Sequence, residues 1–161
     1  MYPYLNDENN EREFDAIFDV TNKLLSKRKS IREKAAGDIV KNGKNAVRPL
    51  GYLLECCARS AMSDEELDAL AEEVGNILVK TGTDALPDLE DFAENGDCNI
   101  YVNEVAQEII FKIKGLDGKD KRNVCKHLVC MVVEKEKKKV LQCVICDAEF
   151  EYKNKKDKLK K

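Results

Sequence analysis

Apolar residues recur every three or four positions along most of the first 114 residues of the chain. The earliest clear stripe consists of Phe14, Ile17, Phe18, Thr21, Leu24 and Leu25. This spacing places apolar side chains on one face of an α-helix. The strict alternation that marks a half-buried strand does not occur in this part of the chain. The pattern therefore predicts a mainly helical fold as far as about residue 114.

Polar residues and glycines predict where the helices begin and end. Ser30 with Glu33, and Ser63 with Glu66, have the three-residue spacing of a capping box, which satisfies backbone N–H groups at a helix start. Glycine accepts the left-handed conformation that closes a helix. Three dipeptides with this glycine predict helix ends: Asn42-Gly43, Thr81-Gly82 and Asn95-Gly96.

The helical pattern repeats after a shift of 39 residues. Apolar, small and glycine positions match in both copies: Ile31 with Leu70, Ala35 with Val74, Ile39 with Leu78, Val40 with Val79, Gly43 with Gly82, Ala46 with Ala85, Val47 with Leu86, Leu50 with Leu89, and Leu53 with Phe92. The first half of the unit occurs a third time, at Tyr101, Val105, Ala106, Ile109, Ile110 and Ile113. About two and a half copies are therefore present.

Two helices joined by a glycine turn, at a period near 40 residues, resemble a HEAT repeat. The segment IREKAAGDIVKNGKNAVRPLGYLL carries this resemblance, which covers roughly residues 30–114. Pro49 and Pro87 depart from it, because they are one residue out of register between the copies. The resemblance implies a short α-α superhelix of HEAT-like helical hairpins whose surfaces hold other proteins. The alternative is a helical bundle without true repeats.

Two pairs of metal-ligating residues follow the helical part. They are His127-Leu-Val-Cys130 and Cys143-Val-Ile-Cys146, with equal internal spacing and 12 residues between them. A two-residue gap lets a tight turn direct both side chains of a pair toward one point, and zinc prefers four such ligands in a tetrahedron. Four protein ligands leave no open coordination position, so the expected Zn2+ is structural.

The residues between and after the pairs have strand character. Residues 130–133 and 139–142 are expected to run antiparallel around an exposed EKEKK turn, and a third strand is expected at 148–152. This arrangement, over about residues 123–152, resembles a zinc ribbon in which histidine replaces one cysteine. Cys125 is the alternative fourth ligand, and a site made of four cysteines would also suit iron.

Length and charge suggest how these parts are organised. A chain of 161 residues accommodates a HEAT-like helical domain at 1–116, a zinc-ribbon-like module at 117–152 and a basic disordered tail at 153–161. The net charge of −3 divides into −10 over residues 1–118 and +7 over 119–161. The sequence shows neither a signal peptide nor an apolar run long enough for a membrane span, so we expect a cytoplasmic protein.

The candidate chemistry favours binding over catalysis. The chain has one histidine and no phosphate-binding glycine loop, so we expect a non-enzymatic adaptor or scaffold that binds a protein partner. The alternative is RNA or DNA binding, within a ribonucleoprotein, through lysines that contact phosphates and through stacking on Phe150 and Tyr152. The candidate lysines are Lys135, Lys137, Lys138, Lys139, Lys153, Lys155 and Lys156. Cys56 and Cys57 are expected to pack in the core, and Cys98 to have no role.

Overall fold

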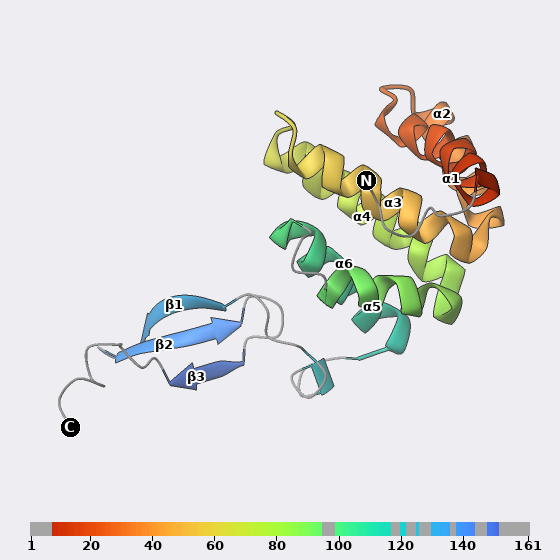
Figure 1. The fold of residues 1–161 in the computed structure, drawn as a ribbon. Coiled ribbons are helices and arrows are strands. Elements are labelled where there is room, and N and C mark those ends of the chain that lie inside the picture. Colours follow the sequence, from red (N-terminus) through yellow and green to blue (C-terminus); the bar gives the residue numbers. More distant parts are fainter. Residues whose placement is uncertain are drawn as a thin grey trace. The chain divides into compact units, whose positions relative to one another are not determined.

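The computed structural model describes the backbone of residues 8–94, 99–116, 120–121, 125, 130–135, 138–143 and 148–151. The chain divides into two compact units, Met1–Gly115 and Leu116–Lys161. The first is helical and the second contains a small antiparallel sheet (Figure 1). No helix in the described residues is long and apolar enough to cross a membrane. The predicted mainly helical fold with a small C-terminal β-structure is confirmed.

Six α-helices and three short 3-10 helices form the described part of the first unit. The α-helices are α1 (Glu8–Thr21), α2 (Lys29–Lys41), α3 (Val47–Ala58), α4 (Asp64–Thr81), α5 (Leu86–Glu94) and α6 (Ile100–Lys114). The 3-10 helices are Asn22–Leu25, Gly43–Ala46 and Gly82–Ala85. The segments matched by the 39-residue shift thus share one order of elements, a helix, a 3-10 turn and a second helix.

The helices of this unit form two layers. Helix α3 contacts α1 and α5 in one layer, and α4 contacts α2 and α6 in the other. The two 3-10 turns, Gly43–Ala46 and Gly82–Ala85, also contact each other. Ala46 and Ala85 are both fully buried there. Equivalent segments of the two copies therefore lie next to one another, as stacked repeats do.

Glycine is required at both equivalent turns. Gly43 has a φ of 55° and Gly82 a φ of 75°, values that side chains with a Cβ rarely adopt. Both predicted helix ends at these residues are confirmed. The third, at residues 95–96, lies outside the described residues.

One of the two predicted capping boxes is correct. The Glu66 amide donates to the Ser63 hydroxyl and the Ser63 amide donates to the Glu66 carboxylate, so α4 begins as expected. The prediction at Ser30 is wrong. The amides of Ile31 and Arg32 donate to the Arg28 carbonyl, which places the cap at Arg28 and Ser30 in the first turn of α2.

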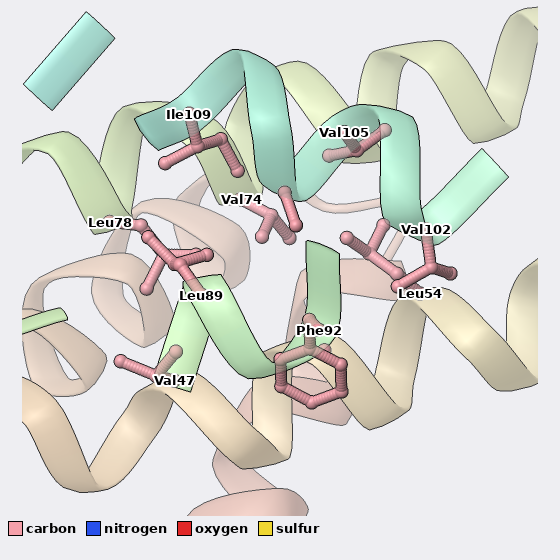
Figure 2. Close-up of a pocket in the computed structure, with 11 residues that line it drawn as sticks. Val47, Leu54, Val74, Leu78, Leu89, Phe92, Val102, Val105 and Ile109 are labelled. Carbon is pink, nitrogen blue, oxygen red and sulfur yellow. The ribbon is translucent and has the colours of Figure 1, made fainter. Parts of the chain in front are cut away.

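The core lies between the two layers, and matched apolar positions of both copies are buried in it. Ile39 and Leu78, for example, are 0% and 2% exposed. Side chains from α3, α4, α5 and α6 surround a residual gap of about 10 Å³ (Figure 2). This gap is apolar and holds no more than one water-sized sphere, so it is a packing defect rather than a ligand pocket. Leu25 departs from the predicted stripe, because it is 43% exposed after α1 has ended at Thr21.

Buried polar contacts fix α6 against its neighbours. The Asn99 amide donates to a carboxylate oxygen of Glu55 on α3 over 2.8 Å, and Glu55 is only 6% exposed. The Asn103 side chain donates to the Phe92 carbonyl over 2.6 Å. Each contact joins α6 to another helix, so the helix that begins the third copy is held by specific hydrogen bonds as well as by apolar packing.

The second unit contains three antiparallel strands in the order β1-β2-β3. They are β1 (Cys130–Lys135), β2 (Lys138–Cys143) and β3 (Glu149–Glu151). Cys130 lies opposite Cys143 in the β1–β2 pairing, and Leu141 lies opposite Phe150 in the β2–β3 pairing. The predicted hairpin and third strand are confirmed. The expected EKEKK turn is too long, because Glu134, Lys135 and Lys138 pair within the strands, and residues 136–137 lie outside the described residues.

Candidate functional site

Two of the predicted metal ligands lie directly opposite each other at one end of the β1–β2 hairpin. Cys130 and Cys143 are partners in the register, so their side chains project from the same face of the sheet. Cys143 is fully buried, and its amide donates to the Ala148 carbonyl over 2.9 Å. This hydrogen bond fixes the end of β2 against the residue that precedes β3.

Cys125 lies next to the same cysteine. Its Sγ is 3.6 Å from the Sγ of Cys143, and both residues are buried. A disulfide would require about 2.05 Å between the sulfurs, so no disulfide joins these two cysteines. Two thiolates bound at about 2.3 Å to a tetrahedral zinc ion lie about 3.8 Å apart. The observed separation therefore fits two ligands of one tetrahedral metal ion.

The structure describes part of the predicted ligand set. His127 and Cys146 lie outside the described residues. Among the residues that are described, no group of three or more histidine, cysteine or acidic side chains is gathered closely enough to hold a metal ion. For the candidate ligands that are described, the structure shows that Cys125 contacts Cys143 and that Cys130 lies on the same face of the sheet as Cys143.

Two of the three described lysines of the sheet, Lys135 and Lys139, have a carboxylate as an ion-pair or register partner. Lys135 forms an ion pair with Glu149, and Lys139 lies opposite Glu134 in the β1–β2 register. Lys138 is exposed on β2. Four more of the candidate phosphate-binding lysines lie outside the described residues: Lys137, Lys153, Lys155 and Lys156. The described sheet is therefore not a uniformly basic surface.

The neighbouring cysteines of α3 differ in their environments. Cys57 is buried, and burial, followed by the effect of Cys56, raises the pKa of its thiol. The packing prediction is therefore correct for Cys57. It is wrong for Cys56, which is exposed because it continues the outward stripe of Arg48 and Tyr52 at four-residue spacing. Cys98 lies outside the described residues.

An aromatic cluster that the sequence did not reveal joins α1 to α3. The ring centroids of Phe14 and Phe18 are 5.9 Å apart, and those of Phe18 and Tyr52 are 5.1 Å apart. Phe14 also lies 6.1 Å from Tyr52. All three side chains are half-buried. The spacing of Phe14 and Phe18 predicted a core stripe, but no local signal indicates that Tyr52, far along the chain, completes a surface cluster.

Charged residues lie about one helical turn before each ring of this cluster. Glu11 and Asp15 are exposed on α1, and within the described part of the chain no cation forms an ion pair with either. Arg48 lies one turn before Tyr52. Its guanidinium is 2.7 Å from a carboxylate oxygen of Asp88 and 3.6 Å from one of Asp91, both on α5. A hydrogen bond with the Cys56 thiol raises the pKa of Tyr52, which keeps its hydroxyl neutral.

A second acidic group lies on the other helical layer. The Tyr101 hydroxyl of α6 donates to Asp68 of α4 over 2.9 Å, and burial is the main cause that raises the pKa of Tyr101. Burial also raises the pKa of Glu104, and the charge of Glu108 raises it further. Unlike Glu11 and Asp15, these groups have no aromatic cluster among the described contacts beside them.

Comparison with known proteins adds no relative. No family model matches the chain, no curated protein matches its sequence, and no solved structure matches its fold.

Proposed function

We propose that this protein is a non-enzymatic adaptor that binds a protein partner through a short HEAT-like α-α superhelix. The observation that carries the proposal is the stacking of equivalent segments, with the turns Gly43–Ala46 and Gly82–Ala85 in contact. Stacked helical repeats bury a continuous core and leave long outer faces, which such proteins use to hold other proteins. The apolar gap that α3, α4, α5 and α6 surround is too small for a substrate.

Polar contacts between neighbouring copies support a rigid binding surface. An ion pair joins α2 to α4, with Nε of Arg32 3.8 Å from Oε2 of Glu73. The Arg48–Asp88 ion pair joins α3 to α5, and the Tyr101–Asp68 hydrogen bond joins α4 to α6. Each exposed ion pair contributes no more than about 1 kcal/mol, but together these contacts fix neighbouring helices of each layer in register.

For the second unit we propose a structural Zn2+ held by Cys125, Cys130, Cys143 and Cys146. This set takes Cys125 in place of His127, because the Sγ atoms of Cys125 and Cys143 have the separation that a tetrahedral zinc site requires. When bound, the metal would supply a cross-link rather than a reaction centre. A three-stranded sheet of this size buries little apolar surface, so a metal would account for much of its stability.

The adaptor role is tested by affinity purification of the full, zinc-loaded chain from native extract, followed by cross-linking and mass spectrometry. We expect a protein whose cross-links reach lysines of the helical unit, such as Lys34 and Lys44, and whose recovery survives nuclease treatment. The matched control is the same purification with an unrelated acidic helical protein. Recovery that disappears after nuclease treatment, with cross-links confined to the second unit, would refute the adaptor role.

That contrary result would support the alternative function, nucleic-acid binding through the sheet and the lysine-rich segment 153–161. One described feature favours this alternative. Phe150 is 40% exposed on β3 and lies opposite Leu141 of β2, the strand that also carries the exposed Lys138 and Lys139. Lys139 and Leu141 project from the same face of the sheet as Phe150, and an exposed ring near a lysine is suited to stacking with bases. The ion pair of Lys135 with Glu149 removes one of the cations that such binding would use.

A further inference from the structure

The aromatic cluster and the free carboxylates of α1 form one continuous feature. Glu11, Asp15 and Phe18 follow one another at spacings of four and three residues, so they share a face of α1. Phe18 and Phe14 in turn contact the ring of Tyr52 on α3. We call these five residues, Glu11, Phe14, Asp15, Phe18 and Tyr52, the aromatic-acidic surface.

This surface has unused capacity for cations. The described acidic residues on several other helices are neutralised locally, as Glu73 is by Arg32 and Glu90 by Lys114. Glu11 and Asp15 have no such partner within the described residues. The helical part as a whole is acidic, with a net charge of −10 over residues 1–118. The resulting field attracts polycations and repels phosphates.

We propose that the aromatic-acidic surface binds a lysine- and arginine-rich segment of a partner protein, an inference that rests on the adaptor function proposed above. Lysine and arginine have an aliphatic stem and a charged end, and the surface offers a complement to each. The stems pack against the half-buried rings of Phe14, Phe18 and Tyr52. The charged ends reach the faces of the same rings and the carboxylates of Glu11 and Asp15.

The geometry favours this layer over the second acidic group. At α4 and α6 the Tyr101 hydroxyl is committed to Asp68, and the raised pKa of Glu104 shows that its charged form is already disfavoured by burial and by Glu108. At the aromatic-acidic surface both carboxylates are exposed and three rings are adjacent. Of these two groups, only the aromatic-acidic surface combines apolar contact with uncompensated charge.

The test measures binding of a fluorescein-labelled decapeptide of five Lys-Arg pairs to the full, zinc-loaded chain by fluorescence anisotropy. The double variant Glu11→Lys/Asp15→Lys should weaken binding about tenfold, since it reverses two contacting charges. The matched control Glu72→Lys/Glu108→Lys makes the same change in net charge at exposed sites of α4 and α6. It should change the affinity by less than about threefold. Equal losses in the two double variants would overturn the proposal, because they would show attraction to the acidic unit as a whole.

A third variant tests the rings without reversing a charge. Tyr52→Leu keeps an apolar side chain against Phe18 but removes the aromatic face, and should weaken binding about threefold. Circular dichroism should show unchanged helicity, which separates a lost contact from a lost fold. Binding as tight as in the natural chain would overturn the role of the aromatic cluster.

A further variant tests which segment occupies the aromatic-acidic surface. Residues 153–161 carry six lysines and are the competing occupant within the same chain. Removing them should leave decapeptide binding within about twofold. A tenfold gain would mean that this segment occupies the surface, and would overturn the assignment to a partner. If a cross-linked partner is still recovered with the Glu11→Lys/Asp15→Lys variant, the adaptor function stands and only the proposed surface is refuted.

Discussion

Replacing Cys143 with serine is expected to abolish metal binding and to unfold the sheet of the second unit, while the helical unit remains folded. Cys143 is fully buried and lies opposite Cys130, and its sulfur is 3.6 Å from the Cys125 sulfur. It is therefore the cysteine that lies beside both of the other described ligands. Loss of one thiolate from a four-ligand site removes most of its affinity, and folding of such a small module is coupled to binding. Metal analysis of the purified protein should change from about one zinc per chain to nearly none.

Three further substitutions make this result specific. Cys125→Ser should lower the metal content as strongly as Cys143→Ser, whereas His127→Ala should leave it nearly unchanged. Cys56→Ser is the matched control, because it alters an exposed thiol of the helical unit by the same chemistry. If His127→Ala loses the metal and Cys125→Ser retains it, the fourth ligand is the histidine. Iron in place of zinc would leave the ligand assignment intact and change only the metal.

Gly51→Ala should be among the most damaging single-methyl changes in the helical unit. A Cβ at Gly51 of α3 would lie closer than 3 Å to Cζ, Cε1 and Cε2 of the Phe92 ring on α5. The Phe92 ring belongs to the core and is only 8% exposed, so relief requires α3 and α5 to separate or the ring to leave its place. Overpacking of this kind costs about 1–3 kcal/mol in the free energy of unfolding.

Gly37→Ala is the matched control for this prediction. Gly37 is exposed in α2, and a Cβ there meets nothing within 4 Å. Replacing a helical glycine without a clash stabilises a protein by about 0.5–1 kcal/mol, so this variant should gain stability. Urea unfolding monitored by far-ultraviolet circular dichroism measures both variants. Similar stabilities of the two variants would mean that α3 and α5 do not pack through Gly51.

Features that depend on neighbouring residues were predictable from the sequence. The helical period, the glycine turns at Gly43 and Gly82 and the strand character of residues 130–133 and 139–142 express preferences within short segments. The failure at Ser30 is also local, since a capping box there competes with a helix that starts two residues earlier, at Lys29. Local patterns thus identify most elements and leave their ends less certain.

Features that depend on contacts between distant segments were not predictable. Whether Cys125 or His127 lies near Cys143 depends on the path of the chain before β1. The spacing of these residues along the sequence is compatible with either as the fourth ligand. The exposure of Cys56 and the joining of Tyr52 to Phe18 depend on where α1 packs along α3. A buried stripe and a surface cluster have the same helical spacing, so tertiary packing alone distinguishes them.

Hydrogen–deuterium exchange of the full, zinc-loaded chain, with and without its captured partner, shows whether the helical unit binds that protein. We expect slower exchange on binding in α1 and α3, around Phe18 and Tyr52, with little change across residues 130–151. Protection confined to residues 130–151, with the helices unchanged, would contradict it.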